Sequence, residues 1–445
     1  MTGALGARLE RLASDLEGTL ADLVRLESVS STADAAVMRR SAEAVAALLE
    51  EAGASARLLE VEGAPPYVLA EAPGPPGTHT VLLYAHYDVQ PPGPLEDWSG
   101  APFEPAVRDG RMYGRGASDD KAGVVTHLGV LRLFEGRPPV GLKILVEGEE
   151  ELGSPHIEAL FAAHGGALRA DVVVIADSTH WRLGEPSLTT SLRGVVDCVV
   201  EVRVLEAGVH SGVYGGAMPD ALMALSRLLA TLHDDRGEVA IEGLHRASPS
   251  AVDLEAADVR SQARVRPGVE LFGEDDLATR TWRAPAISVL GIDAPSIAEA
   301  INQIVPVARA KVSLRTAPGE DAARAMSALV AHLETHAPWG VEVTVTPGSS
   351  ADAFEGDTTG EVYDHFRAAI EEAWGRPPLD IGVGGTIPLV PGFERAFPDA
   401  TIVVTGVGEP LSRMHGPDES QDLGELRRNI LAEARALELL AEPPR

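Results

Sequence analysis

An apolar run that ends in a histidine and an aspartate constrains this sequence more than any other stretch. Val81-Leu82-Leu83 leads into Tyr84-Ala85-His86-Tyr87-Asp88, and Gln90-Pro91-Pro92-Gly93 follows. An apolar run bounded by turn-forming residues predicts a buried strand that ends in a loop. Because strand side chains alternate between faces, His86 and Asp88 point to the same side. The pair is typical of a metal ligand and the carboxylate that orients it, although an ordinary strand end would show the same residues.

Strands and helices alternate along the first half of the chain, which predicts an α/β fold. Leucines at helical spacing open the sequence, and a glycine at position 53 ends a second amphipathic segment. We expect helices near 5–23, 35–52 and 119–134, and strands near 56–61, 67–70, 81–86, 141–146 and 171–176. This order predicts a mixed sheet with helices on both faces, in which functional groups gather beyond the carboxyl ends of the strands.

The pattern changes near residue 188 and reverts near residue 350. Between these positions we expect strands near 195–204, 287–290, 311–315 and 341–346, helices near 219–232 and 320–336, and a polar, acidic stretch at 234–281. That order predicts a ferredoxin-like α+β module. Helices at 361–374 and 422–440 and a strand at 401–405 then resume the first domain. We therefore expect a hydrolase domain formed by 1–187 and 350–445, and an inserted lid or dimerisation domain at 188–349.

Composition limits the partners and the compartment. The chain has 37 Lys and Arg against 67 Asp and Glu, a net charge of −30, which argues against binding nucleic acid or an anionic membrane. Cys198 is the one cysteine, so an intrachain disulfide is impossible, and its strand-like setting predicts a packed core thiol. No signal-peptide core or membrane-spanning run is present in the sequence, so the expected location is the cytoplasm.

Five segments, most of them at the ends of expected strands, carry side chains that bind metals. They are His86, Asp119, Glu150 or Glu151, Asp177 and His415. Imidazoles and carboxylates without thiolates suit zinc or manganese in an open catalytic site. Two histidines and three acids can hold two metals that share one bridging carboxylate, and the spare acid can serve as a base. The residues alone leave open whether Glu149-Glu150 or Glu150-Glu151 is the pair of base and ligand. An alternative without any metal also exists, since a strongly acidic protein carries acids at strand ends for other reasons.

Several motifs together resemble the zinc-dependent family of dipeptidases, aminoacylases and glutamate carboxypeptidases, within it the carnosinase-like dipeptidase branch. The matching stretches are His86-Tyr87-Asp88-Val89-Gln90-Pro91, Gly114-Arg115-Gly116-Ala117-Ser118-Asp119-Asp120-Lys121, Glu147-Gly148-Glu149-Glu150-Glu151-Leu152-Gly153-Ser154, His210-Ser211-Gly212-Val213-Tyr214-Gly215-Gly216, Gly384-Gly385-Thr386-Ile387-Pro388 and His415. They extend from the His86 strand to the last loop, so the resemblance covers most of the chain.

The resemblance implies two divalent metal ions per subunit, with zinc first and manganese or cobalt as alternatives. Asp119 would bridge them. His86 and Asp177 would complete one metal site, and Glu151 and His415 the other.

The resemblance also implies the catalytic groups. The position of Gly153-Ser154 sets Glu150 as the general base that acts on a metal-bridging water, and Asp88 as the group that supports His86. His210 would reach the active site of a partner subunit and stabilise the oxyanion. We therefore expect a homodimer that forms through the inserted domain.

Substrate contacts follow from the same resemblance. Arg315 and Gly384-Gly385-Thr386 would bind a free C-terminal carboxylate, and Asn302 and Gln303 would add polar contacts. The branch commonly has Arg-Glu before these glycines, whereas this chain has Gly382-Val383. This departure affects the expected preference for the C-terminal residue of the substrate and leaves the metal chemistry unaffected.

These observations predict a di-metal hydrolase that cleaves the amide bond of dipeptides with a free C-terminal carboxylate. One alternative is an N-acyl-amino-acid deacylase or carboxypeptidase with the same metal chemistry, acting on an N-acyl amino acid. The other is a non-catalytic relative, which loss of the base or of a ligand would signal. No such residue is lost.

Overall fold

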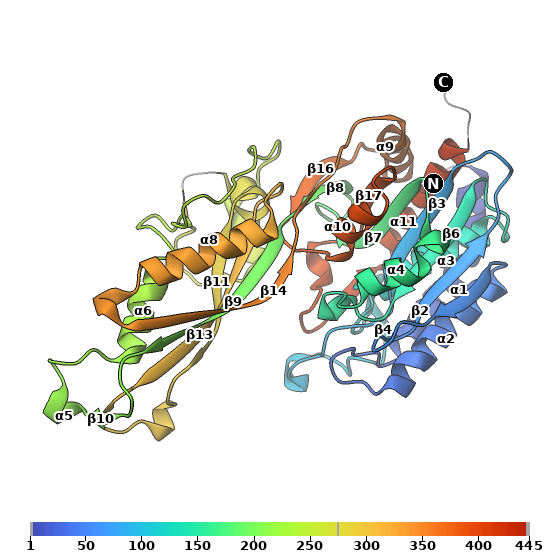
Figure 1. Ribbon diagram of the computed structural model, residues 1–445. Helices are drawn as coiled ribbons and strands as arrows, with labels where there is room; N and C mark the ends of the chain where they lie inside the picture. The colour runs from blue at the N-terminus through green and yellow to red at the C-terminus, as the bar shows by residue number, and fades with distance from the viewer. Residues whose placement is uncertain (1–2, 274–275, 442–445) are drawn as a thin grey trace. The chain divides into compact units, whose positions relative to one another are not determined.

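The protein is described here from a computed structural model that covers residues 3–273 and 276–441. The chain divides into two compact units. Unit 1 comprises residues 1–190, 356–381 and 387–445, and unit 2 comprises residues 191–355 and 382–386. The glycine-rich segment 382–386 therefore groups with the unit formed by the middle of the chain. Figure 1 shows the chain as a ribbon and labels many of its helices and strands.

Unit 1 is built on a sheet of parallel and antiparallel strands. These are β1 (Ser55–Leu59), β2 (Tyr67–Ala72), β3 (Thr80–His86), β6 (Gly141–Glu147), β7 (Val172–Thr179), β17 (Thr401–Gly408) and β8 (Ser187–Leu192). They follow the order β1-β2-β6-β3-β7-β17-β8. β6, β3, β7 and β17 run parallel, and β1, β2 and β8 pair with their neighbours in antiparallel fashion. The prediction of a mixed α/β sheet is confirmed.

Helices cover this sheet. The main core joins alternate residues of β3 (Val81, Leu83 and Ala85) to apolar side chains of five helices. The five are α1 (Ala4–Val24), α2 (Ala35–Glu51), α3 (Lys121–Leu133), α9 (Glu361–Trp374) and α11 (Leu423–Leu440). Two more, α4 (Ile157–Leu168) and α10 (Leu389–Ala396), pack together through Phe161 and Phe393, whose ring centroids lie 5.1 Å apart. Sequence patterning does not predict these two, because glycines in both and a proline in α10 weaken the helical signal.

A small antiparallel sheet holds two distant loops together. It has the order β18-β5-β4, from Ser420–Asp422, Arg111–Tyr113 and Ala106–Arg108. Ser420 pairs with Tyr113, so the segment after His415 lies beside the segment that precedes Asp119. Strands of three residues are too short to show an alternating pattern, and the sequence does not predict them.

Unit 2 contains a four-stranded antiparallel sheet with the order β11-β13-β9-β14. Its strands are β9 (Gly194–Arg203), β11 (Ala286–Asp293), β13 (Val307–Thr316) and β14 (Glu342–Ala351). Two helices, α6 (Ala221–Ala230) and α8 (Ala322–Thr335), share a core with alternate residues of β9, among them Cys198. Cys198 is buried and free, as a core thiol should be. The architecture fits the expected α+β module.

The acidic stretch 234–281 has little regular structure. It contains α7 (Ala256–Gln262) and leads into a helical turn at Thr279–Arg283, and residues 274 and 275 lie outside the described residues. Ile241 and Ala278 are nevertheless buried, and Ile241 belongs to the same core as α6, α8 and β9. Within the part of the chain that the structure covers, none of the helices combines the length and apolar character needed to cross a membrane.

Candidate metal centre

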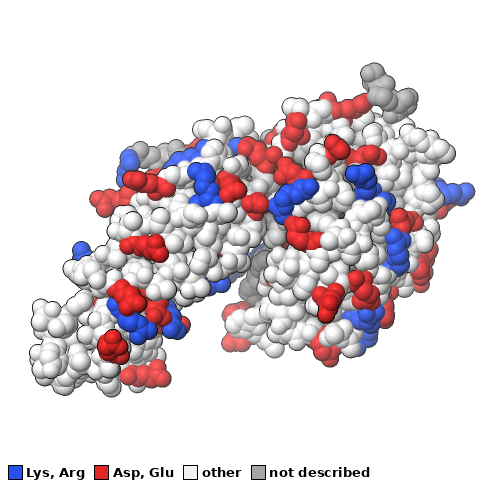
Figure 2. All heavy atoms as spheres, in the orientation of Figure 1, with Lys and Arg blue, Asp and Glu red and all other residues white. Residues whose placement is uncertain are grey.

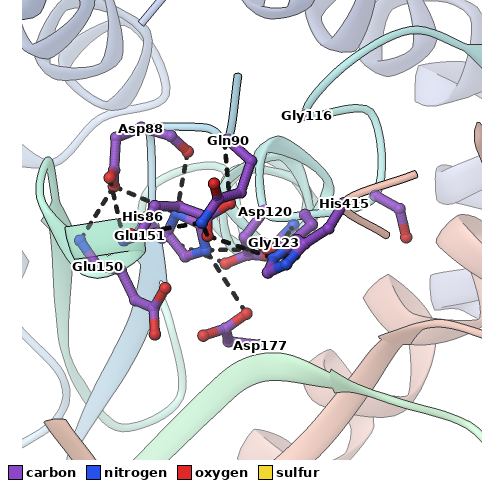
Figure 3. Close-up of polar contacts among 12 residues, drawn as sticks. His86, Asp88, Gln90, Gly116, Asp120, Gly123, Glu150, Glu151, Asp177 and His415 are labelled. Atoms are coloured by element: carbon purple, nitrogen blue, oxygen red, sulfur yellow. Dashed lines mark hydrogen bonds and ion pairs between the residues drawn. The ribbon is translucent and has the colours of Figure 1, made fainter. Parts of the chain in front are cut away.

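The metal-type side chains of unit 1 come from the ends of its strands. His86 is the last residue of β3, Asp177 lies in the final part of β7, and Glu151 follows β6 in a short 3-10 turn. Asp119 precedes α3, and His415 lies in the loop after β17. Because β3, β6, β7 and β17 run parallel, their carboxyl ends share one edge of the sheet. The five side chains meet at this edge. Figure 3 labels four of them, His86, Glu151, Asp177 and His415.

Asp119 lies between the two histidines. Its Oδ1 is 3.1 Å from His86 Nε2, and its Oδ2 is 3.0 Å from His415 Nε2. Asp177 Oδ1 lies 3.6 Å from the same nitrogen of His86, and Glu151 Oε2 lies 3.2 Å from that of His415. Each oxygen of one carboxylate therefore belongs to a separate group of one imidazole and two carboxylates. This donor set fits two divalent cations that share Asp119.

His86 is oriented by its second ring nitrogen. His86 Nδ1 lies 3.0 Å from the main-chain oxygen of Asp88, and the side chain is fully buried. A ring N–H donated to this carbonyl leaves Nε2 as the nitrogen that faces Asp119 and Asp177. The Asp88 carboxylate in turn accepts the backbone N–H groups of Glu150 (3.2 Å) and Glu151 (3.1 Å). Asp88 thus joins the end of β3 to the glutamate pair.

Glu150 and Glu151 differ in what holds their carboxylates. Glu151 accepts the backbone N–H of Gln90 through Oε1 (3.1 Å) and the side-chain amide of Gln90 through Oε2 (2.8 Å). No hydrogen bond from the described residues reaches the Glu150 carboxylate, which points away from the other contacts in Figure 3. Glu151 is therefore fixed as a ligand would be, while Glu150 is free to exchange a proton. Gln90 supports Glu151, a role that sequence reasoning missed.

Asp120 also lies close to His86 and Asp177, with ligand-type atoms within 4.8 Å of one another. Its two oxygens are already engaged: Oδ1 accepts the backbone N–H of Gly123 and Oδ2 that of His86. Asp120 is also the N-cap of α3. Because these bonds fix its carboxylate, we assign Asp120 to capping the helix and Asp119 to the metal group.

Burial and like charges determine the proton affinities at this site. Burial, reinforced by the charge of Asp177, raises the pKa of Glu150 well above its ordinary range. Burial also raises the pKa of Asp177 to about 6. Hydrogen bonds from His415 and His86 hold the pKa of Asp119 below its ordinary value, although burial acts in the opposite direction. A carboxyl group with a raised pKa that lies beside candidate metal ligands suits a general base.

Comparison with known proteins also points to a peptidase. A family model described as peptidase family M20/M25/M40 matches residues 82–439. The chain belongs to this family. Cysteinylglycine-S-conjugate dipeptidase of Corynebacterium striatum is 38% identical over 365 residues, covering 80% of each chain. Cys-Gly metallodipeptidase DUG1 of Saccharomyces cerevisiae is 26% identical over 404 residues, covering 85% of this chain and 83% of that protein.

The solved structure of the yeast dipeptidase Dug1p has the same fold. It superimposes with a TM-score of 0.85 at 23% sequence identity, covering 99% of this chain and 98% of the other. The expected resemblance to the carnosinase-like dipeptidase branch is confirmed, and this chain is an M20 metallopeptidase.

A buried ion pair lies next to the loops that carry Asp119 and His415, and sequence reasoning missed it. Arg115 Nη1 lies 2.6 Å from Glu419 Oε2, and both side chains are almost fully buried. Glu419 also accepts the backbone N–H groups of Gly116, Ser118 and Asp119 at 3.0 to 3.1 Å. The pair therefore holds the loop that carries Asp119.

The substrate-type residues of this M20 peptidase fall into two groups within unit 2. Arg315, at the end of β13, donates from Nη1 to Thr386 Oγ1 at 2.8 Å, beside Gly384 and Gly385. His210 ends β10 (Val209–His210) and pairs with Gln303 of β12 (Gln303–Ile304). The backbone oxygen of Asn302 accepts the N–H of Ser211.

Asn302 and Gln303 therefore lie with His210 and not with Arg315. Both precede Val307, the first residue of β13, whereas Arg315 is near its last. At about 3.3 Å per residue, the part of β13 from Val307 to Arg315 spans about 25 Å. One chain thus presents these two groups at opposite ends of the sheet in unit 2.

Proposed function

We propose that this M20 metallopeptidase is a di-metal dipeptidase that hydrolyses the amide bond of dipeptides with a free C-terminal carboxylate. The observation that carries the proposal is the position of Asp119, whose two oxygens lie 3.1 and 3.0 Å from different histidines. The names of the relatives from Corynebacterium striatum and Saccharomyces cerevisiae support the substrate class.

His86, Asp119 and Asp177 would hold one cation, and Asp119, Glu151 and His415 the other. Zinc is the first choice for histidines and carboxylates without thiolates, with manganese or cobalt as alternatives. When bound, such cations polarise the amide carbonyl and lower the pKa of water.

Proton transfer is assigned to side chains of the protein itself. Glu150 takes a proton from the attacking water and delivers it to the leaving amine, and its raised pKa suits both transfers. Asp88 keeps His86 and the glutamate pair in register through the three contacts described above. In this scheme Arg315, with Gly384, Gly385 and Thr386, binds the C-terminal carboxylate of the substrate.

His210 would donate a hydrogen bond to the developing oxyanion. Its Nδ1 accepts the backbone N–H of Gly212 at 3.0 Å, which leaves the proton on Nε2. The exposed Nε2–H is thus in the donor tautomer that this role requires. Asn302 and Gln303, which lie beside His210, would line the same approach.

We infer that His210 acts on the substrate of a partner subunit in a homodimer. His210 and Arg315 lie at opposite ends of one sheet, separated by about 25 Å of strand, while an extended dipeptide is only about 7 Å long. Both can touch the same dipeptide only if they come from different chains.

The inserted unit offers an apolar surface for such pairing. Val213 and Tyr214 next to His210, Ile297 and Ile301 before β12, and the edge strand β11 with Val289 and Leu290 are all exposed. Exposed apolar side chains and an unpaired strand edge favour association.

Other parts of the proposal rest on charge and composition. We place the enzyme in the cytoplasm, because a chain with a single cysteine suits a reducing compartment. The net charge of −30 argues against nucleic acid or an anionic membrane as a partner. On the face drawn in Figure 2, Lys and Arg are dispersed among Asp and Glu.

The test is a substrate panel on chelated protein supplied with zinc, manganese or cobalt. The panel contains dipeptides, the same dipeptides amidated at the C-terminus, and N-acetyl amino acids. The proposal predicts that free dipeptides are cleaved far faster than the other two classes. Faster cleavage of N-acetyl amino acids would overturn the assignment in favour of a deacylase.

A further inference from the structure

Two arginines meet at the glycine-rich segment of unit 2 without an acidic partner. Arg315 Nη1 donates to Thr386 Oγ1 at 2.8 Å, and Thr386 Oγ1 donates to the main-chain oxygen of Arg193 at 2.5 Å. Among the described residues no carboxylate pairs with either guanidinium. In a chain with 67 acidic and 37 basic residues, two half-buried guanidinium groups without a counter-charge require an explanation.

Arg193 is fixed in place by main-chain carbonyls. Its Nε donates to the oxygen of Gly384 at 3.2 Å and its Nη1 to the oxygen of Ala284 at 3.4 Å. An arginine has five N–H donors, so most donors of Arg193 stay available. A Cβ at position 384 would come within 2.7 Å of Arg193 Nη2 and 2.6 Å of the Thr281 oxygen, so glycine is needed for this packing.

The C-terminal end of the acidic insertion helps to hold Arg193 in place. Thr281 is its last residue and Ala284 follows three residues later, and the main-chain oxygens of both lie at the group formed by Arg193 and Gly384. The insertion braces Arg193 against the glycine-rich segment. Burial and the neighbouring charge of Arg315 lower the pKa of Arg193 to about 10. Both effects disfavour the charged form of Arg193, and an anionic ligand beside the two guanidinium groups would oppose them.

We propose that Arg193 and Arg315 form a two-guanidinium site for a dicarboxylate, so that the enzyme prefers dipeptides whose C-terminal residue is glutamate or aspartate. Arg315 takes the main-chain carboxylate, and Arg193 takes the side-chain carboxylate. The proposal rests on the proposed dipeptidase function for its link to catalysis, but the site itself binds a free amino acid product.

Calorimetric titration with L-glutamate and with L-glutamine tests the site without turnover. The wild-type protein binds glutamate about tenfold more tightly than glutamine, as expected for one additional charge-assisted contact. Arg193→Gln brings the two affinities together, and Arg193→Lys retains part of the difference. Arg309→Gln, on the same strand as Arg315 but in an exposed pair with Glu201, leaves the ratio unchanged. Equal affinities in the wild type, or an unchanged ratio in Arg193→Gln, overturn the proposal.

Kinetics separate this proposal from the function on which it rests. Ala-Glu and Ala-Gln are compared by kcat/KM in the wild type and in the two Arg193 variants. A higher value for Ala-Glu that falls selectively in Arg193→Gln supports the site. Cleavage of both peptides without preference refutes the site and leaves the dipeptidase intact, whereas cleavage of neither refutes the dipeptidase. If Arg193→Gln does not fold, the wild-type preference and Arg193→Lys decide.

Discussion

Arg115 and Glu419 form a buried ion pair that links the two loops carrying Asp119 and His415. Glu419 receives three backbone N–H groups of the Asp119 loop, and Arg115 Nη2 donates to the main-chain oxygens of His415 (3.1 Å) and Pro91 (3.2 Å). One pair therefore positions two members of the proposed second metal group, Asp119 and His415. Removing a partner from a buried pair is costly, because the other charge loses its compensation.

Glu419→Gln should weaken metal binding in the group of Asp119, Glu151 and His415. The amide nitrogen of glutamine would face a backbone N–H where Glu419 now accepts one, so the Asp119 loop would shift. Losses of a supporting contact typically cost about 10- to 100-fold in metal affinity or activity. Elemental analysis after dialysis should show about one metal per chain.

Glu71→Gln is the matched control for Glu419→Gln. Glu71 pairs with Arg57 on the surface of unit 1, and exposed pairs contribute little. Metal content and activity should match the wild type. A Glu419→Gln protein that keeps two metals and full activity would show that the pair does not position the ligands.

Glu150→Ala and Glu151→Ala should fail in different ways. Glu150→Ala should lose several orders of magnitude in kcat and keep both metals, because its carboxylate is not among the proposed ligands. Glu151→Ala should lose a metal, since Glu151 faces His415 at 3.2 Å. Metal content measured beside kcat separates the two roles. Loss of metal in Glu150→Ala with both metals kept in Glu151→Ala would exchange the assignments.

Metal affinity should rise with pH. In the metal-free chain, hydrogen bonds with Asp119 and Glu151 raise the pKa of His415 from 6.5 to about 11. The folded chain thus binds this proton more tightly than the unfolded chain. The resulting stabilisation is complete below pH 6.5 and is lost as the pH rises through about 11.

A cation must displace that proton before it can bind His415. Zinc added to chelated protein should therefore raise Tm more at about pH 8 than at about pH 6, with protons released on binding, and activity should fall steeply below about pH 6. An equal increase in Tm at both pH values would contradict the assignment of His415 as a ligand.

Subunit mixing tests the action of His210 across the dimer. His210→Ala and Glu150→Ala are each expected to be inactive. Exchange between them should restore activity, because one site of the mixed dimer has both residues intact. Mixtures that stay inactive after proven exchange would indicate that His210 acts within its own chain.

The metal-type residues could be predicted because each follows a readable local pattern. His86 and Asp177 end apolar runs, and parallel strands bring such ends to one edge of the sheet. The structure brings these two together with Asp119, Glu151 and His415. Their roles as ligands stay predictions until a metal is measured.

The supporting residues could not be predicted from local patterns. Arg115 and Glu419 are 304 residues apart, and nothing in either segment identifies the other as its partner. The one available signal was proximity in sequence, since Arg115 stands four residues before Asp119 and Glu419 four after His415. Arg193 gave no signal, because its proposed role depends on the lack of a paired carboxylate among the residues that the structure describes.

Because the chain has a single thiol, alkylation of Cys198 can follow the opening of unit 2 separately from unit 1. Cys198 is buried in β9, between β13 and β14, and burial together with Asp197 raises its pKa to about 11. Cys198 packs in the core that β9 shares with α6 and α8, so an alkylating reagent can reach this sulfur only when that core opens. With no other cysteine in the chain, the labelling rate reports the opening of this core alone. It can be read while the metal content of unit 1 is varied, so any coupling between metal loading and the inserted unit appears directly as a change in rate.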